Sequence, residues 1–215
     1  MDAIIENLPV FINGFLKTLA LLAASGVSAF ALGTVVAAMR ISPVGTLRSV
    51  AAVYTELLRN TPLTLVLFFC AFILPYLGVR LDYFVLAVIG LTAYTSPFVA
   101  EAIRSGVNGV PVGQAEAARS IGLNFGQTLQ LVVLPQAIRM VVPPLINVFI
   151  ALTKNTSVAG GFFVIELFAS ASIVINKRGD EVTAILLAIA FFYLVITIPL
   201  GIIAGRIEKR VAVLR

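Results

Sequence analysis

The chain has 215 residues, of which 60% are hydrophobic and 12% are charged. A soluble domain averages about 45–50% apolar and about 25% charged residues, so this excess of apolar residues places the protein in a lipid bilayer. The sequence has no histidine, which excludes histidine-based catalysis and histidine metal sites, and we expect no metal site. The basic residues are scattered and form no continuous stripe, so we also expect no nucleic-acid partner.

Hydropathy predicts five membrane spans, because a spanning helix needs about 20 mostly apolar residues. In chain order the expected spans are 11–39, 62–77, 83–103, 131–165 and 182–204. A helix-stopping proline, Pro43, follows the first span, and an amphipathic piece carrying Arg48 leads to the second. We therefore expect one all-α, polytopic membrane domain over residues 1–215, with a polar cytoplasmic loop at 104–130.

The fourth span is expected to be a broken helix. Residues 131–175 form an apolar stretch that is too long for one crossing and too short for two with an ordinary loop. Polar residues at 154–157 and the pair Gly160-Gly161 interrupt it near its middle. We expect its second half to be angled or to lie partly outside the bilayer.

Five crossings place the two termini on opposite sides of the membrane, and the basic residues decide which side is which. Cytoplasmic segments carry an excess of Lys and Arg. One face carries Arg40, Arg48, Arg59, Arg104, Arg119, Arg139, Arg206, Lys209, Arg210 and Arg215, whereas the other carries Arg80, Lys177 and Arg178. The first face is therefore expected to be cytoplasmic, with the N-terminus outside and the C-terminus in the cytoplasm.

The loop at 104–130 contains a short polar helix followed by a glycine-marked turn. Residues 114–121 favour a helix, and Gly122 suits the left-handed residue that ends one. Small and charged side chains share this segment: Glu116, Ala117, Ala118, Arg119 and Gly122. The small residues allow another protein to approach closely, and the charged ones offer ion pairs at the rim. From the residues alone, a docking element and an ordinary solvated loop stay equally open.

The residues around this turn resemble the signature cytoplasmic loop of ABC-importer permeases. The pattern E-A-A-x3-G at 116–122 is followed by the hydrophobic residue Val132 and by Leu134-Pro135. Every fixed position matches that signature except Val132, where isoleucine is usual. The resemblance implies that this segment contacts a cytoplasmic partner protein.

Further matches extend over residues 11–197 and resemble the polar amino-acid subgroup for histidine, glutamine and glutamate. The stretches 59–65 and 151–156 look closest to glutamate-type permeases. The resemblance implies the ABC type I importer permease fold in a bacterial inner membrane, with glutamate or another polar or acidic amino acid as cargo. It also implies a second homologous permease, forming a heterodimer or, as the fallback, a homodimer, and an extracytoplasmic substrate-binding protein.

The same resemblance implies a coupling helix at about 112–123, which in this family sits in a groove on a cytoplasmic ATPase subunit. The residues expected to carry the coupling are Glu116, Ala117, Ala118, Arg119, Gly122, Leu134 and Pro135. The chain contains no G-x-x-x-x-G-K-[ST] phosphate loop, so we do not expect it to hydrolyse ATP or to be an enzyme. Two separate ATPase subunits would bind ATP and magnesium, and we expect no cofactor on this chain.

Polar residues within the apolar spans are candidates for the substrate path. They are Lys154, Asn155, Thr156, Ser157, Thr95 and Ser96. An ammonium group inside the membrane costs at least about 2.5–3.5 kcal/mol unless it faces a polar cavity or a partner. Two plainer interpretations stay open: an ordinary outer-end turn for the first four, and interhelical hydrogen bonds for the last two. Many members of the resembled family carry aspartate in place of Asn155, and the loss of that negative charge should favour an acidic cargo.

Glu101 and Arg104 lie three residues apart and can form a structural ion pair on one face of the third span.

The sequence as a whole favours one permease subunit of an ATP-driven amino-acid importer. An ion-coupled secondary transporter or channel subunit is the alternative, but that class is commonly built from two inverted repeats, and no repeat is evident in this chain. A purely structural membrane scaffold would leave the polar segment at 116–122 unexplained.

Overall fold

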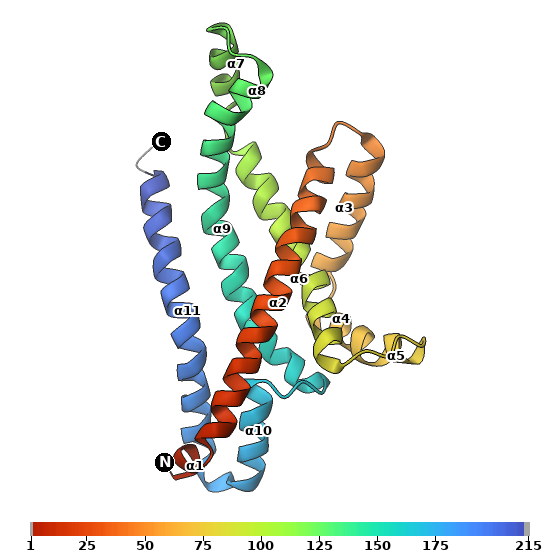
Figure 1. Ribbon diagram of the computed structural model, residues 1–215, viewed down its shortest axis with the longest axis vertical. Coiled ribbons are helices and arrows are strands. Elements are labelled where there is room, and N and C mark those ends of the chain that lie inside the picture. The colour runs from red at the N-terminus through yellow and green to blue at the C-terminus, as the bar shows by residue number, and fades with distance from the viewer. Residues whose placement is uncertain (1, 213–215) are drawn as a thin grey trace.

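The computed structural model describes residues 2–212, which form helices joined by short turns (Figure 1). The α-helices are α1 (Asp2–Glu6), α2 (Leu8–Ile41), α3 (Gly45–Arg59), α4 (Leu63–Phe68), α5 (Leu74–Tyr76), α6 (Tyr83–Asn108), α7 (Val112–Ser120), α8 (Phe125–Gln127), α9 (Leu134–Asn155), α10 (Leu167–Lys177) and α11 (Val182–Ala212). Between them lie two π-helical turns, η1 (Phe69–Ile73) and η2 (Thr128–Val133), and two 3-10 turns, η3 (Thr156–Phe162) and η4 (Gly179–Glu181). Residue 1 and residues 213–215, with Arg215 of the expected basic face, lie outside the described residues.

Within the described residues, four helical runs are long and apolar enough to cross a membrane, and a bent pair makes up to five. The runs are Leu8–Ile41, Tyr83–Asn108, Phe125–Phe162 and Gly179–Arg210. The all-helical, polytopic fold is confirmed. Each run extends beyond the expected span at one end or both, because hydropathy marks the hydrocarbon-facing part of a helix and not the residue at which the helix ends.

A bent pair of helices lies where a single span was expected at 62–77. α3 and the segment Leu63–Tyr76 meet at 101°, and together they have the length and composition of a broken span or of a re-entrant loop. α3 ends where Asn60 and Thr61 each donate a side-chain hydrogen bond of 2.7 Å to a backbone carbonyl one turn back. Pro62 then disfavours the helical conformation for the residue before it. The amphipathic piece expected before the span is the full helix α3, which packs against α2 and α6.

The α-helix α9 ends at Asn155, within the interruption expected at 154–157 and Gly160-Gly161, and a 3-10 turn continues it to Phe162. Its backbone tightens from α to 3-10 geometry at Thr156 and stops before Phe163, whose φ of 66° is left-handed. The hydroxyls of Thr156 and Ser157 donate to carbonyls three residues back, each at 2.7 Å, so these polar groups are satisfied without interrupting the helix. α10 follows as a separate short helix before the last crossing.

α2 and α6 pack closely along the centre of the molecule (Figure 1). A Cβ added at Gly33 of α2 would lie 2.6 Å from the Cβ of Val99 and 2.7 Å from the carbonyl oxygen of Ser96. Glycine is therefore needed for this approach, in keeping with the small residues that line helix interfaces in membranes. Tyr54 ties α3 to the same helix, because its hydroxyl oxygen lies 2.8 Å from that of Ser96.

A buried carboxylate joins α10 to two of the long helices. Glu166 precedes α10 and accepts the backbone N–H groups of Phe168 and Ala169 at 2.9 and 2.8 Å. The Tyr193 hydroxyl of α11 donates to it at 2.9 Å, and the Thr18 hydroxyl of α2 lies 3.5 Å away. These partners satisfy a side chain that is fully buried. The network fixes where α10 begins.

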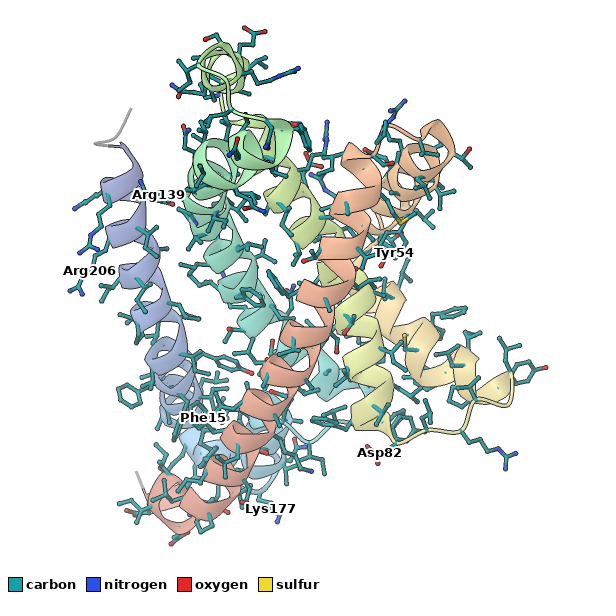
Figure 2. All side chains as sticks on the ribbon, turned by 45° about the horizontal axis from the view of Figure 1, so that its top comes forward. Phe15, Tyr54, Asp82, Arg139, Lys177 and Arg206 are labelled. Atoms are coloured by element: carbon teal, nitrogen blue, oxygen red, sulfur yellow. The ribbon has the colours of Figure 1, made fainter. Side chains whose placement is uncertain are left out.

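The two ends of the bundle carry different elements. One end has α7, the α2–α3 turn and the C-terminal part of α11, whereas the other has α1 and the turn between α10 and α11 (Figure 1). Figure 2 places Arg139 and Arg206 toward the first end and Lys177 at the second. Arg59 is the last residue of α3, yet its guanidinium group reaches the same Glu101 carboxylate as that of Arg40, at 4.0 and 3.9 Å.

Candidate functional site

The segment between α6 and α9 is an ordered helix and turn. α7 is followed by Gly122, whose φ of 91° is a left-handed conformation that glycine adopts without the clash of a Cβ. The Leu123 N–H donates to the Ala118 carbonyl at 3.2 Å, and the Gly122 N–H donates to the Arg119 carbonyl at 3.0 Å. This pair of bonds is the Schellman motif that ends many helices. The left-handed glycine expected from the sequence is confirmed.

A capping box then starts α8. The Asn124 side chain accepts the Gln127 N–H at 2.9 Å, and the Gln127 side chain accepts the Asn124 N–H at 3.0 Å. The helix runs on through η2 into α9, where Leu134 and Pro135 occupy the first turn. Pro135 has no backbone N–H to donate, and the π-helical turn η2 ends two residues before it. These two predicted residues therefore lie at the junction between η2 and the long helix α9.

Apolar side chains at the tip of this segment are left uncovered by the chain itself. Val112, Ile121 and Phe125 are 73%, 80% and 76% exposed. Apolar side chains that gather at an exposed site beside polar ones commonly mark an interaction surface. These three residues were not among the predicted site residues, although they interrupt an otherwise polar loop in the sequence.

The predicted coupling residues on α7 fall into two groups. Glu116, Ala117 and Arg119 are exposed and available to another protein. Ala118 is 5% exposed and is buried within the segment, where α7 packs against η2. Ala118 was expected on the approachable face, but it instead lets the segment fold back closely on itself.

A cavity of about 410 Å³ opens between α6 and α9. It is lined by Tyr94, Thr95, Phe98, Asn147, Val148, Ala151, Leu152 and Asn155. Small-molecule sites of about 300–1,000 Å³ typically combine apolar walls with a few polar groups. The lining residues supply two amides, a threonine hydroxyl and a tyrosine, and none of them carries a charge at neutral pH.

The cavity brings together two of the predicted path residues, Thr95 of α6 and Asn155 of α9. The Thr95 side chain is 3% exposed, and its hydroxyl has no hydrogen-bond partner within the described residues. A buried polar group without a partner costs about 1–3 kcal/mol. Because this oxygen is covered by protein atoms, the polar groups that the lining offers to a guest are the amides of Asn147 and Asn155 and the Tyr94 side chain.

The other predicted path residues do not line this cavity. Ser96 is turned toward Tyr54, and it holds α3 against α6. Thr156 and Ser157 bond their own helix backbone, and the Lys154 side chain is exposed. The interhelical hydrogen bond left open for Ser96 is therefore the interpretation that the structure supports.

Asn147 and the aromatic pair Tyr94 and Phe98 line the cavity but were not predicted as site residues. Asn147, Ala151 and Asn155 follow one another at intervals of four residues, which places them on one helix face. Tyr94 and Phe98 have the same spacing on α6, and their ring centroids lie 5.4 Å apart. This periodicity is the signal that could have found them.

Glu101 and Arg104 form the expected ion pair, with the Arg104 Nη1 at 3.0 and 3.2 Å from the two carboxylate oxygens. Two further arginines join it from other helices. Arg40 of α2 and Arg59 of α3 lie 3.9 and 4.0 Å from Glu101 Oε2. The sequence could not show this convergence, because the three helices meet only in the folded chain.

Crossing helices, an ordered polar segment at one end and an uncharged polar cavity between two spans define the membrane component of a transporter. Residues 29–213 match the family model described as "Binding-protein-dependent transport system inner membrane component", and the chain belongs to this family.

Two similar proteins narrow the group within the family. The chain is 40% identical to a glutamate transport system permease protein of Corynebacterium glutamicum, with 95% of each protein covered. It is 41% identical to a probable glutamine ABC transporter permease protein of Bacillus subtilis, covering 98% of this chain and 97% of that protein. A solved amino acid ABC transporter with histidines is 30% identical, with a TM-score of 0.88 over 96% of both chains.

The chain is thus a polar amino-acid ABC transporter permease, a multi-pass protein of the inner membrane, and it is not itself catalytic. Permeases of this family work with an ATPase and a binding protein. Membership decides against the ion-coupled transporter or channel that was the alternative. The expected relation to the glutamate and glutamine permeases is confirmed.

Proposed function

We propose that this permease imports glutamate, or another acidic or polar amino acid, through the cavity between α6 and α9. The observation that carries the proposal is the cavity's chemistry: Asn147 and Asn155 bring two amide side chains to its wall, and none of its described lining residues carries a carboxylate. Amides and hydroxyls can bond the ammonium and carboxylate groups of an amino acid. A wall without negative charge does not repel an acidic side chain. The names of the two similar proteins, one for glutamate and one for glutamine, support the same cargo class.

The end that carries α7 faces the cytoplasm in this proposal, and residues 112–123 dock on an ATPase subunit. The exposed side chains of Ile121 and Phe125 supply an apolar anchor, while Glu116 and Arg119 supply charges at its rim. The gathering of basic side chains toward that end supports the orientation. The end that carries α1 then faces outward, where a substrate-binding protein delivers the cargo.

Force from the ATPase enters the bundle through the ordered turn. Gly122 fixes the angle at which α7 leaves, and Leu134 and Pro135 pass the movement into α9, the helix that carries Asn155. Two ATPase subunits carry ATP and magnesium. A second homologous permease completes the path on the open side of the cavity. We propose that this second permease is a different chain, so that the two form a heterodimer.

The cargo proposal is tested by ATP-driven uptake in proteoliposomes that contain this permease, its partner permease, the ATPase and the binding protein. Asn155→Asp places a carboxylate on the cavity wall, and we expect it to lower glutamate uptake roughly tenfold through charge repulsion while glutamine uptake falls much less. Ser157→Asp adds the same charge outside the cavity and serves as the control. Unchanged glutamate uptake by Asn155→Asp would remove the electrostatic part of the proposal.

The orientation is tested with one cysteine at the tip. Cys70 is buried and is replaced by serine, and Ile121→Cys then introduces a thiol at an 80% exposed position. A membrane-impermeant maleimide should label this thiol in inverted vesicles that contain the permease without its ATPase, and leave it unlabelled in right-side-out cells. The opposite pattern places the α7 end outside and contradicts the proposal.

A further inference from the structure

Three arginine side chains from three helices converge on one carboxylate. Arg40 of α2, Arg59 of α3 and Arg104 of α6 all lie within 4.0 Å of Glu101. Three positive charges against one negative charge leave an excess of two positive charges. Arg104 and Glu101 already satisfy one another through hydrogen bonds of 3.0 and 3.2 Å. The excess therefore belongs to Arg40 and Arg59.

These two guanidinium groups have hydrogen-bonding capacity that the chain does not use. Each carries five N–H donors. Within residues 2–212, neither group donates a hydrogen bond, since both stand beyond hydrogen-bond distance from Glu101, at 3.9 and 4.0 Å. The Arg40 Nε is buried and has no partner among these residues, whereas the Arg59 side chain is 40% exposed. An unpaired buried donor is costly, so Arg40 lacks an acceptor, and an anion beside the two groups would supply acceptors.

The arginine cluster adjoins the cavity. The Arg59 guanidinium carbon lies 5.7 Å from the centroid of the Phe98 ring, and Phe98 lines the cavity. A single aromatic ring thus separates the cavity from the Arg59 guanidinium group, and Arg40 approaches the same Glu101 oxygen as Arg59. Phe98 and Glu101 follow one another on α6 toward the end that carries α7. A solute that moves from the cavity toward that end encounters the arginines next.

We propose that Arg40 and Arg59 form a second, transient binding site for the side-chain carboxylate of the cargo, between the cavity and the α7 end. The inference rests on the proposed import of acidic amino acids. A guanidinium group binds a carboxylate in a planar, two-pronged geometry, and two such groups can hold one carboxylate from two sides. The cavity walls carry no charge, so this cluster is where an acidic cargo is distinguished from a neutral one.

The phosphate of an anionic lipid has similar chemistry, but the surroundings favour the cargo. The Arg40 side chain is 14% exposed, so little of it is open to lipid. Arg59 is held against a cavity wall by its contact with Phe98. Clusters that recruit lipid headgroups lie on open basic surfaces next to the membrane.

The test compares glutamate and glutamine uptake by the complete transporter in phosphatidylcholine vesicles. We expect Arg59→Gln to lower Vmax/KM for glutamate roughly tenfold, the effect of losing one charge-assisted hydrogen bond, and to change that for glutamine less than about twofold. Arg59→Lys keeps the charge without the planar fork and should recover part of the loss. Because the ratio of the two uptake rates is measured, a lower yield of folded variant does not affect the result.

The matched control is Arg48→Gln. It removes the same charge from the same helix, at an exposed position where the side chain bonds the carbonyls of Ser42 and Pro43, and it should leave the ratio unchanged. Equal losses for glutamate and glutamine in Arg59→Gln assign Arg59 a structural role and overturn the second site, while the cargo proposal stands. A wild-type transporter that takes up no acidic amino acid removes the cargo proposal and the site with it. An effect that appears only when phosphatidylglycerol is added assigns the arginines to lipid phosphate and also overturns the proposal.

Discussion

The Thr18 hydroxyl lies 3.5 Å from Glu166 Oε2 and accepts the backbone N–H of Leu167 at 3.2 Å. Thr18 therefore contacts both the Glu166 carboxylate and the first residue of α10, the helix that this carboxylate caps. Both side chains are fully buried. The start of α10 is thus fixed to α2 by side chains separated by most of the chain.

Removing this acid should destabilise the permease. Glu166→Ala leaves two backbone N–H groups and the Tyr193 hydroxyl without their acceptor, at an expected cost of about 3 kcal/mol. Thermal unfolding of the detergent-purified protein measures this loss. Tyr193→Phe deletes one donor from the same network and should cost only about 1 kcal/mol. Equal costs for the two variants would contradict the central role of Glu166.

Neighbouring hydroxyls on α6 should separate ligand binding from stability. Thr95→Val removes a buried hydroxyl that has no partner within the described residues, so we expect thermal stability to rise by about 1 kcal/mol. Because Thr95 lines the cavity, we also expect roughly fivefold weaker binding of the cargo. Ser96→Ala removes the bond to Tyr54, so it should lower stability by about 1 kcal/mol and leave binding unchanged. Radiolabelled amino-acid binding and thermal unfolding of each variant distinguish the two. The reverse pattern would show that Thr95 faces no ligand.

The turn after α7 should transmit force only with glycine at its left-handed position. Gly122→Ala has open space for its Cβ but must hold a φ of 91°, which costs about 1–2 kcal/mol for an L-residue. We expect a severalfold fall in the cargo-stimulated ATPase activity of the assembled transporter. Gly126→Ala makes the same change nearby, where the added Cβ meets only an ordinary contact at 3.5 Å, and should have little effect. Equal activities would mean that the turn geometry does not matter for coupling.

The contact between α2 and α6 should not tolerate a methyl group. Gly33→Ala would push a Cβ against Val99 and the backbone of Ser96, and overpacking of this kind costs about 1–3 kcal/mol. Gly201→Ala on α11 has nothing within 4 Å of its added Cβ, so it should be neutral or slightly stabilising. Thermal unfolding of the two variants, compared with the wild type, checks the difference. A stable Gly33→Ala protein would show that the two helices can separate without cost.

Features that depend on neighbours in the sequence were predictable, and those that depend on distant residues were not. The turn at Gly122 follows from glycine's freedom at positive φ, and the Glu101–Arg104 pair follows from helix spacing. Hydropathy did not predict that α3 pairs with the following apolar segment, because the charged residues of α3 lower its hydropathy and the two helices are joined only by a bend. Hydropathy has no information about such a bend.

The candidate site was also predictable only in part. Asn155 and Thr95 were found as polar residues within apolar spans, but Thr156 and Ser157 look alike in sequence and are satisfied by their own helix backbone. The partnership of Ser96 with Tyr54, and that of Arg59 with Glu101, join helices whose contact no local pattern reveals.

The 101° corner between α3 and α4 has a consequence for the surroundings of the permease. The chain leaves helical geometry around Asn60, Thr61 and Pro62, between two helices that together have the composition of a broken span or a re-entrant loop. Hydrocarbon cannot satisfy exposed peptide groups, so irregular backbone within a bilayer persists only where protein covers it or water reaches it. A corner at bilayer depth would therefore have to point away from the lipid acyl chains, toward a hydrated vestibule or a neighbouring subunit.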